Sequence, residues 1–387
     1  MKISKRAIFI NWITAFFWLW ALLCAWTVLP IPESLKPNMA LAAFIILALQ
    51  ILAHCDVKTI ICLKDREANF IAIIGILTII CLLLAHSNPG AFFSVINLCL
   101  LWYLSDKWSW NQKQIFFMGV VYLCLYAVWI YNPMLFGDRT NTNVTGTVSV
   151  FLMLTLICCI RFLFPNRKWT IMLEIILVFL SFRKLFIFHG RGSLVALSLY
   201  VVLRLLIFST LWQKERLYKL LCYILTLGSL FFVFIYTALW KIAGSDVTFT
   251  LLGKSLFSGR EKIWYEVWTY FKSQPFIGIG SNVELQSWFE YNLHNALYNI
   301  LITHGIIVFI LVIVFMLRKM LLLYSKYSQY SIFIPVLSGV FAIYMGSFFE
   351  MDLIWFPEFL VWTFMLVVLA SAPAAFTKEP LSKEPSK

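Results

Sequence analysis

Two basic positions in the second half of the chain suit chemistry on a charged substrate. Arg260 follows Ser258 and Gly259 and would stand in the first turn of a predicted helix. A cation is unfavourable beside a helix N-terminus, so Arg260 must gain something else there. With the free N–H groups of that turn it would form an anion site. His294 stands just before an apolar run, and histidine is the side chain best suited to proton transfer near neutral pH.

A third candidate, Arg191, lies between two glycines in a Gly-Arg-Gly-Ser segment, where backbone could approach a ligand closely. Each candidate also has a plain structural explanation. Arg260 could be a surface arginine or a partner of Glu261, and His294 could be an interfacial histidine bonded to a carbonyl. Arg191 could anchor a helix at the membrane surface. His304, ten residues after His294, is interpreted as structural.

The composition indicates the solvent around these residues. The 387 residues are 62% hydrophobic and 13% charged, with a mean hydropathy of +0.87. A soluble domain has roughly half apolar and a quarter charged residues, so the bilayer is the remaining solvent. The apolar runs are continuous rather than alternating, which favours helices over a membrane β-barrel.

Twelve apolar runs are long enough to be considered spanning helices. They lie near residues 7–29, 39–54, 69–86, 91–104, 115–131, 143–164, 169–185, 193–212, 220–240, 295–317, 331–349 and 353–372. The first run has no small-residue cleavage pattern and is predicted to be a spanning helix rather than a removed signal peptide. The sequence therefore predicts an all-α, polytopic membrane protein of about twelve transmembrane helices.

The net charge of +13 does not predict a nucleic-acid partner, because the basic residues are spread over the short gaps between apolar runs. With the N-terminus inside, twenty basic residues fall on the cytoplasmic side and ten outside, which places both termini in the cytoplasm. We expect a single membrane domain over residues 1–372 and a disordered cytoplasmic tail over 373–387.

The outside basic residues are unevenly placed. Nine of the ten lie after residue 130, in loops near 132–142, 183–192 and 241–294. Positive charge on that side weakens the topology signal, and an anionic ligand there is the natural reason for it.

The external loop 241–294 is the one long loop that the sequence predicts, and loops of about 54 residues are usually functional or disordered. Its tryptophans and phenylalanines argue against disorder. Ser258 and Glu261 have the spacing of a capping box for a helix near 259–272, whose apolar face would lie at the membrane interface. Pro275 would end that helix.

No metal and no cofactor are expected. The nine cysteines fall in apolar runs or near their predicted cytoplasmic ends, so we expect no disulfide and no zinc-type Cys/His cage. The acidic residues outside, such as Asp138, Asp246 and Asp352, are scattered and show no metal-binding motif.

Three sequence blocks together resemble the O-antigen ligase and O-antigen or capsular polysaccharide polymerase superfamily of bacterial membrane glycosyltransferases. They are Gly190-Arg-Gly-Ser193, Ser258-Gly-Arg-Glu-Lys-Ile-Trp264 with Pro275-Phe-Ile-Gly-Ile-Gly280, and His294-Asn-Ala-Leu297 followed by Gly305. A weaker fourth block is Phe349-Glu-Met-Asp352. Thr142-Asn143 stands where a Pro-Asn pair would be expected.

The resemblance implies an inverting, metal-independent transfer of a glycan from an undecaprenyl-diphosphate carrier on the outer face of the inner membrane. It implies that Arg191 and Arg260 bind the diphosphate and that His294 assists the acceptor hydroxyl. Supporting roles would fall to Arg139, Asn295, Glu350 and Asp352. The acceptor would be a glycan, as in a repeat-unit polymerase, or lipid A-core, as in a ligase; the polymerase is taken first.

Two other classes of function stay open. A lipid-glycan flippase should carry ionisable residues along a path inside the membrane, and the sequence offers few: Glu174, Arg204 and Glu358. We expect Glu174 and Arg204 to pair structurally in adjacent helices. A scaffold or assembly protein would need none of the three candidate site residues.

Overall fold

The structure is a computed structural model, and it describes most of the chain. The described residues are 3–26, 39–133, 142–165, 167–188, 190–207, 212, 214–243, 250–251, 254–255, 257–286, 292–356 and 358–376. Within these ranges the fold is all-α, apart from one hairpin of two-residue strands, β1 (Thr250–Leu251) and β2 (Lys254–Ser255).

Each of the twelve predicted apolar runs carries a helix. In chain order these are α1 (Lys5–Trp26), α2 (Met39–His54), α4 (Arg66–Leu84), α5 (Pro89–Leu104), α6 (Gln112–Tyr131), α7 (Thr142–Leu163), α8 (Lys168–Phe188), α9 (Arg191–Val201), α11 (Glu215–Ala243), α13 (Ala296–Tyr327), α14 (Phe333–Gly346) and α15 (Glu358–Ala375). Two short helices complete the described chain, α3 (Val57–Ile61) and α12 (Arg260–Phe271).

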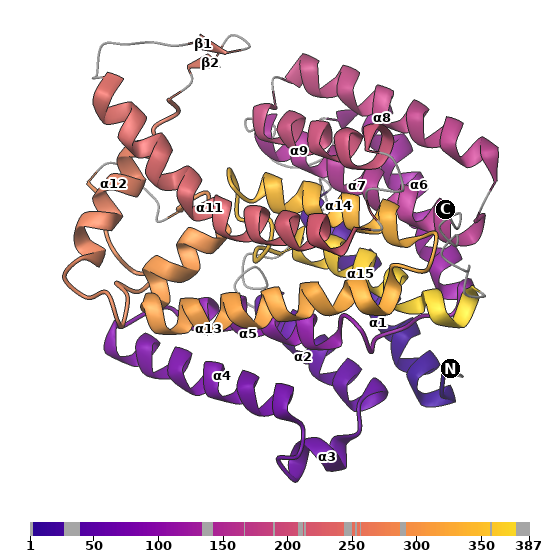
Figure 1. The fold of residues 1–387 in the computed structure, drawn as a ribbon, viewed down its shortest axis with the longest axis horizontal. Helices are drawn as coiled ribbons and strands as arrows, with labels where there is room; N and C mark the ends of the chain where they lie inside the picture. Colours follow the sequence, from indigo (N-terminus) through magenta and orange to yellow (C-terminus); the bar gives the residue numbers. More distant parts are fainter. Residues whose placement is uncertain are drawn as a thin grey trace, which may run out of the picture.

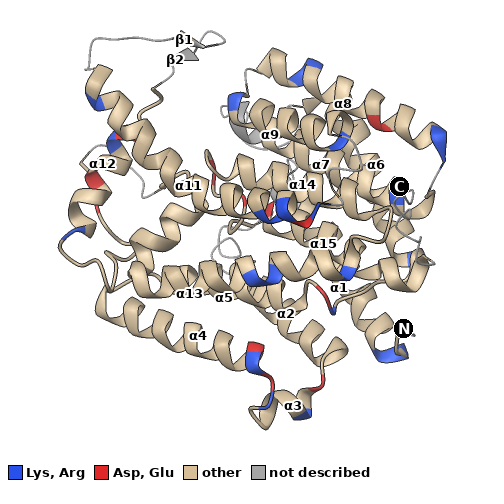
Figure 2. Cartoon of the chain, in the orientation of Figure 1, with Lys and Arg blue, Asp and Glu red and all other residues tan. Residues whose placement is uncertain are grey.

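Seven of the described helices are long and apolar enough to cross a membrane: α1, α4, α6, α7, α11, α13 and α15. Helices α2, α5 and α14 are apolar but shorter. A polytopic membrane protein accounts for this pattern, and the count of twelve spans stays a prediction. Figure 2 shows the helices free of charged residues over most of their length, with Lys, Arg, Asp and Glu gathered mainly near helix ends.

The helix starts follow from local chemistry. Asp65 caps α4 by accepting hydrogen bonds from the N–H groups of Glu67 and Ala68. Asn111 and Gln114 form a capping box at the start of α6. Pro89 opens α5 where its missing N–H has no partner to lose.

The centre of the bundle is formed by the helices with the most buried faces. In the most apolar window of each helix, 83% of α7 and 78% of α15 is buried, against 28% of α11 and 33% of α4. α11 and α4 therefore lie at the outside of the bundle, where their apolar side chains would meet lipid. Figure 1 shows α12 at one end of the bundle, with the start of α1 and the end of α15 at the opposite end.

The apolar run near 295–317 carries a helix, but that helix is interrupted, which the sequence did not predict. Gly305 inside α13 has φ +80° and ψ 170°, which breaks the helical ladder. The freed backbone groups are used by the segment after α12: Ile279 N–H donates to Ile302 O (2.9 Å) and Ile306 N–H donates to Pro275 O (2.9 Å). Irregular backbone at membrane depth is tolerated where protein satisfies it in this way.

The glycines at this break have no room for a side chain. A Cβ atom on Gly305 would stand 2.1 Å from Phe276 O, and one on Gly278 would stand 2.5 Å from Thr303 O. Asn282 then donates to His86 O (2.8 Å), in the loop between α4 and α5. The topology predicts that loop on the outer side, the same side as residues 241–294, so this contact agrees with the prediction.

The predicted run over 193–212 is also not one regular helix. α9 ends at Val201 and continues as a π-helix, η3 (Val202–Leu206), which contains Arg204. The pairing of Arg204 with Glu174 is confirmed, with Nε 2.9 Å from Oε1. The sequence did not predict the other partners of Glu174, which are Arg161 from α7 (Nε to Oε2, 2.9 Å) and Tyr200 (Oη to Oε1, 2.6 Å).

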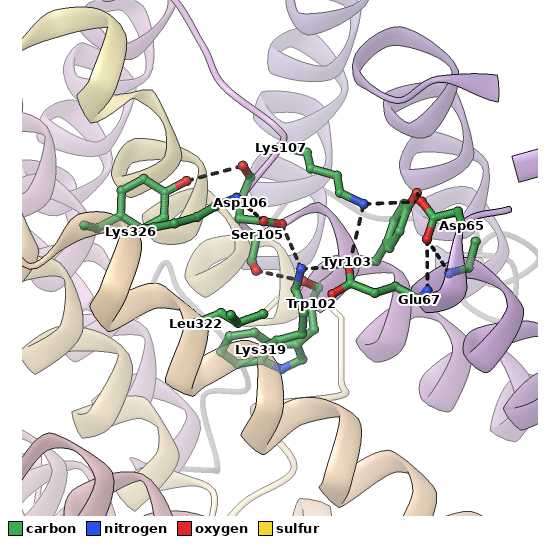
Figure 3. A network of polar contacts seen from close by, with 12 residues as sticks. Asp65, Glu67, Trp102, Tyr103, Ser105, Asp106, Lys107, Lys319, Leu322 and Lys326 are labelled. Atoms are coloured by element: carbon green, nitrogen blue, oxygen red, sulfur yellow. Dashed lines mark hydrogen bonds and ion pairs between the residues drawn. The ribbon is translucent and has the colours of Figure 1, made fainter. Parts of the chain in front are cut away.

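A second buried ion cluster joins three distant parts of the chain (Figure 3). Lys319 of α13 is 1% exposed, and its Nζ lies 3.1 Å from Glu67 Oε2 and 2.8 Å from Asp106 Oδ1. Lys326, about two turns further along α13, contacts the other oxygen of Asp106 but is half exposed. Lys107 lies within 3.7 Å of the carboxylates of Asp65 and Glu67.

This cluster predicts a difference between two lysines that share one partner. Lys319→Ala should destabilise the protein by about 3–5 kcal/mol, because it leaves two carboxylates near the core without their buried cation. Lys326→Ala removes an exposed cation from the same Asp106 and should cost less than about 1 kcal/mol. Thermal unfolding of the purified variants in detergent measures both changes. Equal losses of stability would contradict the conclusion that Lys319 is the buried cation on which the cluster depends.

Candidate functional site

Helix α12 begins one residue later than the capping box required. Its N-cap is Gly259, with φ +94°, and no side chain caps the first turn, so the predicted capping role of Ser258 is wrong. Glu261 does reach back as predicted. Its two carboxylate oxygens accept from the N–H of Gly259 at 3.0 and 3.1 Å. The left-handed conformation at Gly259 makes Arg260 the first helical residue, so it lies in the first turn as expected, one position earlier in the helix than the capping box implied.

The apolar face of α12 packs on protein. Ile263, Trp264, Val267 and Phe271 are at most 4% exposed, and the helix contacts α11 and α13. α11 and the first turns of α13 cover this face, so it does not meet lipid directly, and the position of α12 at the membrane interface stays a prediction. Only the flanking aromatic side chains, such as Tyr265 at 41% exposure, remain open.

Two hydrogen bonds fix α12 against the start of α13. Trp264 Nε1 donates to Leu293 O (2.5 Å), and Tyr298 Oη donates to Trp264 O (2.9 Å). Because Leu293 precedes His294, these bonds hold the turn that carries Arg260 close to the residue that carries the imidazole.

His294 has a positive φ of +47°, which is unusual for a residue with a side chain. Its N–H donates to Asn292 Oδ1 (3.0 Å), and the next residue, Asn295, is the fully buried N-cap of α13. Asn295 Oδ1 accepts from Tyr298 N–H (2.9 Å), and Nδ2 donates to Phe348 O (3.1 Å). The polar atoms of Asn295 thus join α13 to the segment after α14.

Arg191 is the first residue of α9, with Gly190 as its N-cap. The neighbouring Gly192 faces the chain itself: a Cβ atom there would stand 3.3 Å from Phe349 Cβ. Gly192 thus allows close packing on the segment that carries Glu350, and it also lines the cavity described next, so its role in ligand approach stays a prediction.

Arg191 and Arg260 line one cavity of about 370 Å³, as do Glu350 and Asp352. Much of the remaining wall is apolar and comes from α7, α9, α11 and α14, including Val150, Phe151, Val195, Leu239 and Ile343. The structure therefore brings the two predicted anion-binding arginines, 69 residues apart in the sequence, to the same hollow. A cavity with charged groups and apolar walls suits an amphiphile.

Glu350 connects Arg260 to His294. One carboxylate oxygen pairs with the Arg260 guanidinium, and the other lies 3.0 Å from His294 Nδ1. The three side chains are 16%, 24% and 20% exposed in the order Arg260, Glu350 and His294. His294 does not line the cavity, but its partner Glu350 does.

The pKa values of the two carboxyl groups in this segment, Glu350 and Asp352, are shifted in opposite directions. Burial raises the pKa of Glu350, but the charge of Arg260 and the contact with His294 outweigh it and hold the pKa below its ordinary value of 4.5. Burial, followed by the nearby charges of Glu350 and Glu358, raises the pKa of Asp352 well above its ordinary range. At neutral pH Glu350 is therefore an anion, while Asp352 tends to hold its proton.

The remaining predicted site residues have different outcomes. Arg139, Asp138 and Asp246 lie outside the described residues, and so does the side chain of Asn143. Among the residues that the structure describes, no three His, Cys, Asp or Glu side chains come together as a metal site would require. Glu350 held only a supporting place in the sequence analysis, and the only sequence signal for it was its weak Phe-Glu-Met-Asp block.

These features define a class: a helical membrane protein with an arginine-lined cavity next to a carboxylate–histidine pair. Residues 176–313 match the family model described as O-Antigen ligase. The matched segment includes Arg191, Arg260 and His294, and the chain resembles the O-antigen ligase and polymerase superfamily. This supports a membrane glycan-transfer enzyme of the ligase or polymerase type. A comparison with curated proteins gave no match.

The hydrogen bonds of Asn295, which join α13 to the segment after α14 next to His294, can be tested by measuring protein stability. Asn295→Ala should lower the unfolding free energy by about 1–3 kcal/mol, because it leaves buried partners on Tyr298 and Phe348 unsatisfied. Asn282→Ala, which removes one exposed hydrogen bond to His86 O, should cost less than about 1 kcal/mol. Thermal unfolding in detergent compares the two variants, and an Asn295→Ala variant with wild-type stability would argue against this role of Asn295.

Proposed function

We propose that this protein moves a glycan from an undecaprenyl-diphosphate carrier to a sugar hydroxyl on the outer face of the cytoplasmic membrane. The acceptor that we propose first is another lipid-linked repeat unit, which makes the protein an O-antigen or exopolysaccharide polymerase. The observation that carries the proposal is the meeting of Arg191 and Arg260 in one cavity, with Glu350 linking Arg260 to His294.

The arginines suit the leaving group. Cleavage of a sugar–diphosphate bond leaves negative charge on the diphosphate, and guanidinium groups grip phosphate oxygens by paired hydrogen bonds. Glu350 engages one nitrogen of Arg260, Nη2, and a guanidinium has five N–H donors. We propose that the two arginines neutralise this charge without a metal ion, and that the apolar walls hold the first units of the polyprenyl chain.

The histidine suits the acceptor. Ionised Glu350 would accept a hydrogen bond from His294 Nδ1–H, which leaves Nε2 as the basic nitrogen. In the proposed step the acceptor oxygen attacks the anomeric carbon and its proton passes to His294 Nε2. The bond from the anomeric carbon to the diphosphate oxygen breaks, and the electron pair leaves with the diphosphate. Attack opposite the leaving group inverts the anomeric configuration.

Glu350 and Asn295 would position these groups from the protein side, and Asp352 would supply a neutral carboxyl group in the cavity wall. Arg139 stays a proposed supporting residue. Glu350 would also compensate the positive charge that His294 gains beside Arg260 when it takes the acceptor proton.

The placement on the outer face rests on the predicted topology. The distribution of basic residues favours cytoplasmic termini. In Figure 1, α12 lies at the end of the bundle opposite the start of α1 and the end of α15, which supports a site on the side away from the termini.

The alternatives make different demands. A ligase would use the same groups but take lipid A-core as the acceptor. A flippase would use Glu174 and Arg204 along an open path. Instead, the Glu174 side chain is 0% exposed and paired with two arginines, which favours an enzyme. A scaffold would not depend on the cavity residues.

The first test removes the site groups. Arg191→Ala, Arg260→Ala and His294→Ala should each reduce glycan transfer by about 10²-fold or more, because each removes charge neutralisation or the base. Arg260→Lys should recover only part of the activity, since an ammonium cannot make the paired contacts. The assay is in vitro transfer from a defined undecaprenyl-diphosphate oligosaccharide, with a lipid-linked repeat unit or lipid A-core as acceptor.

The matched control is Arg183→Ala, an exposed arginine of α8 that is predicted on the same side and does not line the cavity. It should transfer glycan normally. Full activity in both Arg260→Ala and His294→Ala variants that insert normally would overturn the proposal in favour of scaffolding.

The second test uses pH. The depressed pKa of Glu350 means that its ion pair adds stability above the unfolded value of 4.5 and that this stability is lost as pH falls through the lower folded value. The difference in unfolding temperature between wild type and Glu350→Gln should therefore stay constant between about pH 6 and pH 8 and shrink below about pH 4.5. A difference that instead grows on acidification would contradict the ionised state of Glu350.

A further inference from the structure

A second cavity, of about 230 Å³, lies between α11, α12 and the first turn of α13. Trp264 lines this cavity and also the arginine-lined one. The two hollows are therefore neighbours that share one buried indole, and a molecule in the second would lie beside the reaction centre.

Among the described residues that line the second cavity, the charged ones are both lysines. They are Lys241 of α11 and Lys272, the residue after α12. The nearby Glu266 is engaged by Tyr270 Oη (3.0 Å) and by the N–H of Gln286 (2.7 Å). Both lysines are exposed, and Lys241 Nζ lies 3.7 Å from the centre of the Tyr265 ring.

The rest of the lining is aromatic and apolar. Tyr265 and Trp268 of α12 and Tyr298 of α13 contribute rings, and Val233, Phe234 and Ala238 of the membrane-spanning α11 contribute apolar surface. Tyrosine and tryptophan gather at the boundary between lipid and water, and lysine there holds its ammonium toward the headgroups. The cavity thus offers two ammonium groups next to hydrocarbon, which fits a phosphate carried by a lipid.

We propose that this cavity binds the lipid phosphate of the acceptor and so holds the acceptor glycan beside the arginine-lined cavity. The inference rests on the proposed function, in which donor and acceptor are both lipids with phosphate groups. Lysine suits this role because it is a flexible point charge that can hold and release a phosphate as the acceptor changes. The fixed guanidinium groups of Arg191 and Arg260 suit the leaving diphosphate.

Lipid binding tests the cavity without any enzymatic activity. Native mass spectrometry of the full chain in detergent micelles containing dioleoyl phosphatidic acid should show a retained lipid that Lys241→Gln/Lys272→Gln loses. Inorganic phosphate should not displace it, and dioleoyl phosphatidylcholine should be retained less. Lys241→Arg/Lys272→Arg should keep the lipid. Equal retention by wild type and the double Gln variant would overturn the proposal, and so would displacement of the lipid by free phosphate.

Transfer kinetics test the assignment to the acceptor. The double Gln variant should raise the KM for the lipid-linked acceptor by about tenfold or more, with the KM for the donor and kcat at saturating acceptor nearly unchanged. Lys219→Gln, at the opposite end of α11 and paired with Glu215, is the matched control and should match wild type.

The two experiments separate the possible failures. Loss of lipid with an unchanged acceptor KM would overturn the acceptor role and leave a bound structural lipid. An increase in donor KM would assign the cavity to the donor instead. Absence of transfer in wild type would overturn the proposed function, whereas the mass spectrometry result would still decide whether the cavity binds a lipid phosphate.

Discussion

The site depends on one carboxylate with two partners. Glu350 contacts the guanidinium of Arg260 and, 3.0 Å away, the imidazole of His294. These residues come from three elements: the first turn of α12, the residue before the N-cap of α13, and the segment between α14 and α15. Removing a partner from a partly buried carboxylate is costly, so the interaction requires the three elements to meet. The contacts around the site hold these three elements together.

The elements meet through contacts made largely by backbone and by small or fully buried side chains. Trp264 bonds the carbonyl of Leu293, Asn295 bonds the carbonyl of Phe348, and Gly192 lets Phe349 approach α9. Further out, Pro275 and Ile279 fill the break in α13 at Gly305. The loop after α12 is thus part of the helical framework, which is why a site built from a long loop can hold its charged groups in fixed positions.

The sequence predicted well what depends on local pattern. Each apolar run carries a helix, and α12 appears within one residue of its predicted bounds. Arg191 and Arg260 line one cavity, while their predicted roles and that of His294 stay predictions. Prediction from the sequence failed where the cause lies in another element of the fold. The break at Gly305 exists because Pro275–Gly280 inserts there, the buried Lys319 has partners over 200 residues away, and Arg161 joins Glu174 from another helix. Glu350 looked minor because only the folded chain brings it between its partners.

Under the proposals made above, four of the ten basic residues on the predicted outer side acquire a common explanation. Each such charge weakens the bias that orients the chain in the membrane, so their presence requires a compensating use. Arg191 and Arg260 line one cavity, and Lys241 and Lys272 line the neighbouring one, with Trp264 common to both. The division by residue type follows a physical difference: guanidinium groups hold a diphosphate in a fixed geometry, whereas ammonium groups attract a phosphate without fixing it. The transfer that we propose, between two lipid-borne glycans, needs one substrate held rigidly at the bond that breaks, and it needs the other to be exchanged after each turnover.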